Sequence, residues 1–78
     1  MGGNNLKNAN LIGAFMKGTF LVTADLEGAN LEGANLWIAN LEGANLKGAN
    51  LRNALLLDTN LEGANLKAAV MPDGTRQE

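Results

Sequence analysis

The chain has 78 residues, with eight acidic and six basic residues and a net charge of −2. So small a charge, with both signs interspersed, argues against a polyanion-binding surface and against a strongly acidic mimic. Cysteine is absent, which excludes disulfides. No apolar run approaches the roughly 18 residues of a membrane span and no export leader is recognisable, so we expect no membrane span and a cytoplasmic location. A processed lumenal or periplasmic form stays open.

A five-residue repeat has its central residues from Leu6 to Met71, and the central residue is Leu in twelve repeats and Met in two. The residue two places earlier is Ala in eleven repeats, and the residue just before the centre is Asn in nine. Five residues advance an α-helix by about 500°, and an odd period puts successive Leu residues on opposite faces of a strand. The pattern therefore predicts a coil that turns a corner every five residues, with four sides and 20 residues in each turn.

The corners are predicted to be four-residue turns that run from a central residue to the next Ala. The third turn position holds Gly in seven repeats. A type II turn needs φ > 0 at this position, which Gly adopts freely and Asn or Asp tolerates. The residues that we expect to tolerate it are Asn8, Asn53, Asp58 and Asp73. Three residues fit poorly, so another turn type is predicted at Thr23, Ile38 and Ala68. Pro72 takes the second position of the last turn, which Pro favours.

With this geometry the Leu and Ala side chains point inward and the other three positions of each repeat face solvent. Alternating large and small side chains can fill a narrow tube without voids. The Asn residues that precede the centres are expected to form hydrogen-bonded ladders between coils. Stacked charges such as Glu32 over Arg52 and Glu27 over Lys47 are expected to contribute at most about 1 kcal/mol each.

The runs ADLEGANLEGAN, ANLEGANLKGANLRNA and TNLEGANLKAA follow the pattern Ala-(Asp/Asn)-Leu-x-x. In this the chain resembles the pentapeptide-repeat family over about residues 4–73. The resemblance implies an all-β solenoid, a right-handed quadrilateral β-helix, here with about 3.5 coils of 20 residues and little or no α-helix. We expect a single domain over residues 1–78, with the repeats in 4–73 and a polar tail in 74–78.

Most residue types that perform acid–base or nucleophilic catalysis are missing, because the chain has no His, Cys, Ser or Tyr. The segment from Asp58 imitates a calcium loop, but Ala69 stands where a bidentate Glu is required. Gly13 to Thr19 imitates a phosphate loop without its Lys. We therefore expect no enzyme activity, no catalytic residue, no metal, no cofactor and no small-molecule substrate.

Apolar residues at outward positions gather on one wall when the sequence is folded at 20 residues per coil. Trp37, the only Trp in the chain, is among them. Exposed apolar clusters usually mark interaction surfaces, and Trp is a common anchor residue there. The predicted interaction wall carries Phe15, Trp37, Ile38, Leu55 and Leu57. The alternative is that this wall packs against a terminal segment or that its apolar residues are merely tolerated.

A second apolar group, Ile12, Phe20 and Val22, belongs to the first full coil. We expect these residues to shield the N-terminal end of the tube or to extend the contact made by the predicted interaction wall. Stacked repeats expose strand edges at both ends, and neither end offers an amphipathic helix as a cap. Self-association, or contact with another repeat protein, would cover such edges.

The sequence thus favours a non-catalytic repeat scaffold that binds a protein, either another copy in a homo-oligomer or another repeat protein. The alternative, which the resemblance implies for longer members of the family, is a DNA-mimic modulator of DNA gyrase or topoisomerase. The net charge of −2 and the short length depart from that pattern. A third class is an accessory module of an enzyme or membrane complex. Direct nucleic-acid binding is not expected, because the basic residues are dispersed among acidic ones.

Overall fold

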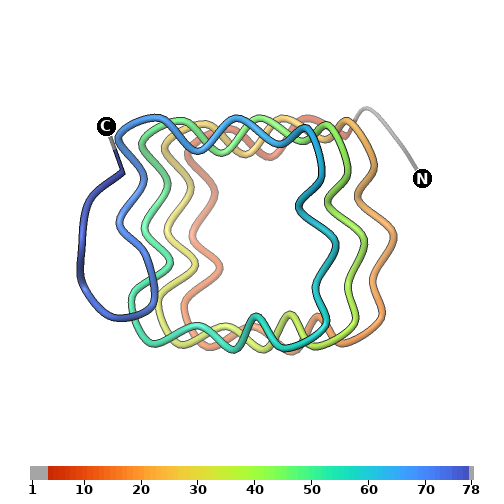
Figure 1. The fold of residues 1–78 in the computed structure, drawn as a ribbon, viewed down its shortest axis with the longest axis horizontal. Helices are drawn as coiled ribbons and strands as arrows, with labels where there is room; N and C mark the ends of the chain where they lie inside the picture. Colours follow the sequence, from red (N-terminus) through yellow and green to blue (C-terminus); the bar gives the residue numbers. More distant parts are fainter. Residues whose placement is uncertain (1–3, 78) are drawn as a thin grey trace.

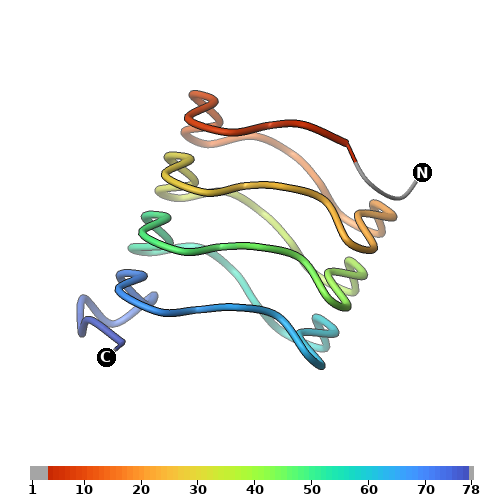
Figure 2. The ribbon, with the colours of Figure 1, turned by 90° about the horizontal axis from the view of Figure 1, so that it is seen from above.

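The computed structural model describes residues 4–77, which wind into a tube with a square cross-section (Figure 1). Viewed from the side, the coils stack regularly along the tube (Figure 2). Residues 1–3 and 78, which the predicted domain includes, lie outside the described residues. Within residues 4–77 there is no helix and no extended strand, because each side of the square contributes a single bridging residue to its neighbours. These bridges therefore hold neighbouring coils to one another.

Parallel bridges fix the register of the coils and join residues that are 20 apart, as in Asn10 to Asn30 and Asn30 to Asn50. The backbone N–H of Leu11 donates to the carbonyl of Asn30 at 2.7 Å, and the N–H of Asn30 donates to the carbonyl of Ala9 at 2.9 Å. The same pair of bonds recurs at successive repeats. The predicted coil of four five-residue sides is thus observed, and backbone groups are satisfied by the neighbouring coils.

The corners are turns in which the N–H of an Ala donates to the carbonyl of the preceding central residue, as in Ala9 to Leu6 at 3.0 Å. All seven corner glycines have φ between 67° and 72°. Asn8, Asn53 and Asp58 adopt the same positive φ. The prediction of positive φ at the third turn position, as a type II turn requires, is confirmed for these residues.

The prediction of another turn type at Thr23, Ile38 and Ala68 is wrong. Their φ values are 58°, 53° and 64°, and Thr23 still lies within a turn closed by the Ala24 N–H donating to the Leu21 carbonyl at 3.1 Å. The Thr23 N–H also donates to the next coil, at the Glu42 carbonyl. These bonds can form only if the corner keeps the shape of its neighbours. Tertiary contacts therefore override a local preference worth about 1–2 kcal/mol.

The last turn also departs from the prediction, because positive φ moves from Asp73 to Gly74, where φ is 88°. The N–H of Gly74 donates to the carbonyl of Met71 at 2.8 Å, and the chain reverses. Val70 then pairs antiparallel with Arg76, and the N–H of Gln77 donates to the carbonyl of Ala69. The segment predicted as a polar tail therefore forms a C-terminal hairpin, which projects beyond the square (Figures 1 and 2).

The turn of the C-terminal hairpin is fixed by Asp73. Its carboxylate accepts a hydrogen bond from the Thr75 hydroxyl at 2.7 Å and another from the Thr75 backbone N–H at 3.0 Å. These bonds favour the charged form and lower the pKa of Asp73 from its ordinary value of 3.8, the hydroxyl having the larger effect. The sequence carried a signal for this turn, since Pro-Asp-Gly is a common turn motif.

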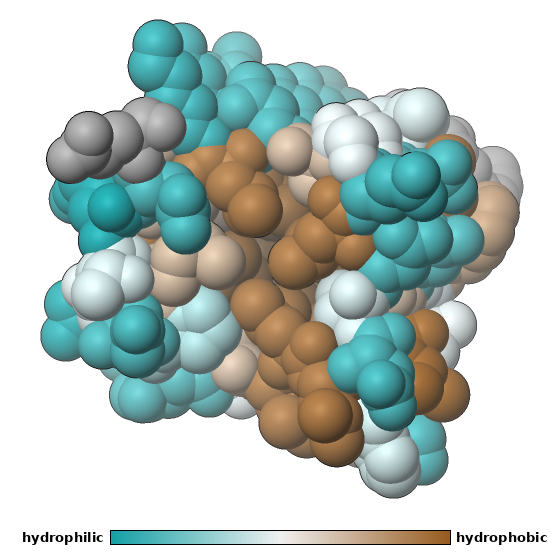
Figure 3. All heavy atoms as spheres, in the orientation of Figure 1, coloured by the Kyte–Doolittle hydropathy of each residue, from teal (hydrophilic) through white to brown (hydrophobic). Residues whose placement is uncertain are grey.

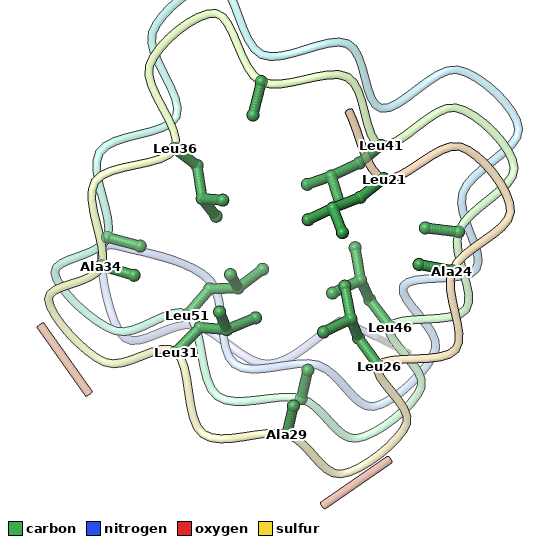
Figure 4. Packing of buried hydrophobic residues seen from close by; sticks show 14 residues of the cluster. Leu21, Ala24, Leu26, Ala29, Leu31, Ala34, Leu36, Leu41, Leu46 and Leu51 are labelled. Carbon is green, nitrogen blue, oxygen red and sulfur yellow. The ribbon is translucent and has the colours of Figure 1, made fainter. Parts of the chain in front are cut away.

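The tube is filled by the central Leu residues with small Ala residues between them (Figure 4). Leu side chains of the middle coils are fully buried, among them Leu26, Leu36 and Leu46. Leu11 and Leu61, which belong to the outer coils, are only partly buried and pack against this core. Apolar atoms are accordingly visible inside the square when the molecule is viewed along the tube (Figure 3).

The Asn residues before the centres act locally and do not form the predicted ladders. The Asn50 Oδ1 accepts the backbone N–H of Arg52 at 3.0 Å, and the same bond recurs in other repeats. Within residues 4–77, the one hydrogen bond between side chains of adjacent coils joins Asn45 to Asp25 at 3.5 Å. An Asx turn uses a neighbouring donor at little entropic cost, so it competes successfully with bonds between coils.

The charges of adjacent coils are paired at one place in the part of the chain that the structure describes. The Lys7 ammonium lies 3.9 Å from the Glu27 carboxylate. The predicted pairs Glu27–Lys47 and Glu32–Arg52 stack in the expected columns but form no ion pair within residues 4–77. The exposed pair that does form contributes at most about 1 kcal/mol.

Candidate interaction wall

One side of the tube and the corner that follows it, which together we name the Trp37 wall, consist of residues 15–19, 35–39 and 55–59. Parallel bridges join Phe15 to Asn35 and Asn35 to Leu55. The N–H of Ile38 donates to the carbonyl of Leu57 at 3.0 Å. The structure therefore brings the five residues of the predicted interaction wall together, with Phe15 and Leu55 on the side and Trp37, Ile38 and Leu57 at its corner.

The apolar side chains of the Trp37 wall differ in exposure. Phe15 is the most exposed, at 77%, and Leu57 follows at 57%. Ile38 and Leu55 are also exposed, whereas Trp37 is half-buried. Transfer of such apolar area from water to a partner is favourable by about 25 cal/mol per Å². Phe15, rather than Trp37, is thus the most prominent apolar side chain on the wall.

The Trp37 side chain is partly covered by another residue of the Trp37 wall. The Lys17 ammonium of the preceding coil lies 4.4 Å from the centroid of the indole ring. The N–H of Trp37 donates to the Asn35 Oδ1 at 3.1 Å, which fixes the backbone at this position. The indole Nε1 is buried and has no hydrogen-bond partner within residues 4–77, a situation that costs about 1–3 kcal/mol.

Phe15 and Leu55 occupy the repeat position just before the central residue, where most repeats have Asn. Nine repeats hold Asn there, and those within the regular coils accept the N–H two residues on, as Asn50 does from Arg52. An apolar side chain cannot accept this bond, which is worth about 1 kcal/mol. Val70 differs, because Pro72 has no N–H to donate. Local stability therefore does not account for Phe15 and Leu55.

The charged residues of the Trp37 wall sit at its two ends. Lys17 belongs to the first coil of the wall and Asp58 to the third. Both are exposed, and neither forms an ion pair with another of the described residues. The middle coil, residues 35–39, carries no charge. The wall is thus an apolar strip with a positive end and a negative end.

The second predicted group is not gathered on the Trp37 wall. Ile12 lies on the adjoining side at 56% exposure, and Phe20 and Val22 lie on the side formed by 20–24, 40–44 and 60–64. Phe20 is 53% exposed and pairs with Asn40 through the backbone, whereas Val22 is half-buried. These three residues therefore occupy two different sides of the tube.

Residues 4–77 form no pocket. In the same part of the chain, no group of three or more His, Cys, Asp or Glu side chains is arranged to hold a metal ion. None of the described segments is a helix long and apolar enough to cross a membrane. The candidate site is accordingly the outer surface of the Trp37 wall.

The family described as "Pentapeptide repeats" matches residues 5–36 and 39–71 in eight copies. No curated protein matches the chain. The family match covers most of the tube but leaves out residues 37–38, which belong to the middle coil of the Trp37 wall.

Two solved structures are similar in sequence and shape. The first is HetL, a pentapeptide repeat protein involved in heterocyst differentiation regulation in the cyanobacterium Nostoc, with 45% identity and a TM-score of 0.68. The second is a pentapeptide repeat protein from the Arabidopsis thaliana thylakoid lumen, with 33% identity and a TM-score of 0.54. Each match covers 97% of this chain but only 33% of HetL and 56% of the Arabidopsis protein. These likenesses support the right-handed quadrilateral β-helix.

Proposed function

This chain belongs to the pentapeptide-repeat family, and we propose that it is a non-catalytic scaffold whose Trp37 wall binds another protein. The observation that carries the proposal is the contiguous set of exposed apolar side chains on this wall, led by Phe15 at 77% and Leu57 at 57% exposure. Exposed apolar clusters of this kind mark interaction surfaces on otherwise polar proteins.

The residue types on the Trp37 wall favour a binding role over the alternative that its exposed apolar side chains are merely tolerated. Phe15 and Leu55 each give up a hydrogen bond that Asn provides at the same position of other repeats. Their side chains gain free energy only when something removes them from water. The residues 75–77 do not supply that cover, because they pair with residues 68–71 on a different side of the tube.

The rigidity of the scaffold favours the same function. The backbone of the Trp37 wall is bonded to coils on both sides in its middle layer, as Asn35 to Ala14 and Leu36 to Leu55 at 2.9 Å. A wall fixed in this way loses little conformational entropy when it binds. The regulatory involvement of HetL fits a family member that acts by contact rather than by catalysis.

Site-specific photo-cross-linking tests the proposal. A photoreactive amino acid is introduced in place of Leu57 on the Trp37 wall or in place of Lys47 on the opposite side, both of which are exposed. We expect the label at position 57 to capture a discrete protein that mass spectrometry identifies. Capture should be lost when Trp37→Glu is added, since Glu is the native residue at this repeat position in four other repeats and fits the fold.

The position 47 label is the matched control for non-specific capture. Equal capture at positions 57 and 47, or capture that survives Trp37→Glu, would contradict a binding role of the Trp37 wall. An adduct that depends on the wall should also re-form between the purified components.

A further inference from the structure

We propose that the occupant of the Trp37 wall is a second copy of this chain, bound wall to wall with the two tubes antiparallel. This inference rests on the proposed function, because it takes the Trp37 wall to be a protein-binding surface. It adds the identity of the partner and the orientation in which the partner binds.

A two-fold axis that lies in the interface and crosses the tube along the strand direction exchanges the first and third coils of the wall. Phe15 then faces the partner's Leu55, and Leu55 faces the partner's Phe15. The middle coil lies on the axis, so Asn35 faces its own equivalent. The most exposed side chain of the wall is thereby covered by an apolar residue of the partner, and this contact occurs twice.

The positions of the two charges decide between the possible orientations. In the antiparallel arrangement Lys17 comes close to the partner's Asp58, and again the contact occurs twice. If the tubes were parallel, each coil would face its own equivalent, so Lys17 and the partner's Asp58 would lie two coils apart and could not pair. Opposite charges across an interface favour association and fix its register, whereas like charges disfavour it. The charged ends of the Trp37 wall therefore select the antiparallel pair.

The area of the Trp37 wall limits the affinity that we expect between the two copies. The molecule measures 28 × 22 × 20 Å, so one side presents no more than roughly 600 Å². A standard stable interface buries about 800 Å² on each partner. The predicted dimer is consequently a weak one, with a dissociation constant in the micromolar range or above, and it forms only at raised concentration.

Chemical cross-linking tests the orientation on a clean background, because the chain has no cysteine. Chains carrying Phe15→Cys and chains carrying Leu55→Cys are mixed and treated with a short bifunctional thiol reagent. We expect cross-linked dimers to form several-fold faster in the mixture than in either variant alone. Asn35→Cys, which lies on the axis, should cross-link to itself. Faster reaction of Phe15→Cys with itself than with Leu55→Cys would overturn the antiparallel arrangement.

Sedimentation equilibrium tests the association itself. We expect Phe15→Asn combined with Leu55→Asn to raise the dissociation constant at least tenfold, while the fold is retained because Asn is the usual residue at this repeat position. The matched control is Phe20→Asn, the same change on another side of the tube, which should leave the dissociation constant unchanged. Asp58→Asn should raise the constant about two- to fivefold. A fall on Asp58→Asn would overturn the antiparallel pairing.

The outcomes separate this inference from the function on which it rests. A chain that stays monomeric at all concentrations, while the label at position 57 still captures a different protein, overturns the second copy and leaves the scaffold function standing. A monomer without any capture at position 57 overturns both.

Discussion

The Lys17 ammonium lies 4.4 Å from the centroid of the ring of Trp37, which belongs to the next coil of the tube. A cation placed over an indole face is attracted by the ring quadrupole, which adds about 0.5–1 kcal/mol at an exposed site. This contact covers part of the ring and is consistent with the half-buried state of Trp37, whose repeat position faces solvent.

Lys17→Met should test this contact, because it removes the charge and keeps an unbranched apolar side chain over the ring. We expect a loss of about 0.5–1 kcal/mol in the free energy of unfolding. The fluorescence of Trp37, the sole Trp, should also change. Chemical denaturation and emission spectra provide the two measurements. Lys7→Met serves as a control, since it removes a charge that contacts Glu27 and should leave the emission unaltered.

Leu41→Ala should strongly destabilise the tube. The Leu41 side chain is fully buried, so truncation leaves a cavity and is expected to cost about 2–5 kcal/mol. Leu66→Ala, a matched change at a partly buried position of the outer coil, should cost clearly less. Urea denaturation of both variants measures the difference. Equal losses would mean that the outer coil packs as tightly as the middle of the tube.

The corner residues should respond to substitution with opposite signs. Ala68→Gly is expected to stabilise the tube by up to about 1 kcal/mol, because Ala68 has a φ of 64° that glycine adopts more easily. Gly33→Ala should destabilise it by about 1 kcal/mol through conformation alone, since a Cβ there meets open space. Gly28→Ala carries the additional need to displace the Asn8 side chain. Melting temperatures that leave all three variants unchanged would contradict this account.

Leu55→Asn should make the single chain more stable, by about 0.5–1.5 kcal/mol, because the new amide oxygen can accept the N–H of Leu57. The reverse experiment is Asn50→Leu, which removes the bond from the Arg52 N–H and should destabilise by a similar amount. Thermal unfolding at low protein concentration measures the monomer alone. A stabilised chain that associates less would identify Leu55 as a residue that serves binding at the expense of stability.

The C-terminal hairpin should open in acid. The lowered pKa of Asp73 means that its carboxylate favours the folded hairpin, so this stabilisation is fully present above the ordinary pKa of 3.8. It is lost as the pH falls through the lowered folded-state pKa of Asp73. Hydrogen exchange of the Gln77 N–H, which donates to Ala69, should show a protection factor that falls below that pKa. Asp73→Asn should remove this pH dependence.

The fold was predictable to an unusual degree, because one rule repeats along the chain. The five-residue period excludes helix and flat strand, and glycines at the third turn position indicate where the chain bends. Residues 20 apart do pair, as Asn10 with Asn30. The shared location of Phe15, Leu55 and Leu57 on the Trp37 wall also follows from this period alone.

Predictions based on single residues failed where contacts between coils decide the conformation. Ile38 is a poor residue for positive φ, yet its N–H and its turn are held by neighbouring coils. Asn50 was predicted to bond to the Asn residues stacked in adjacent coils, but its Oδ1 accepts the nearby Arg52 N–H. These outcomes depend on which of several possible hydrogen-bond partners is preferred, and the repeat pattern does not give that preference.

By itself, then, the sequence determined the period, the inward Leu and Ala, the corners and the side on which Trp37 lies, since each is a local consequence of spacing along a regular coil. Only the tertiary structure decided that Lys17 covers Trp37 and leaves Phe15 most exposed, and that residues 75–77 fold back on residues 68–71. These features arise from side-chain and backbone contacts between coils, where packing and hydrogen-bond geometry select one arrangement among several that the spacing permits.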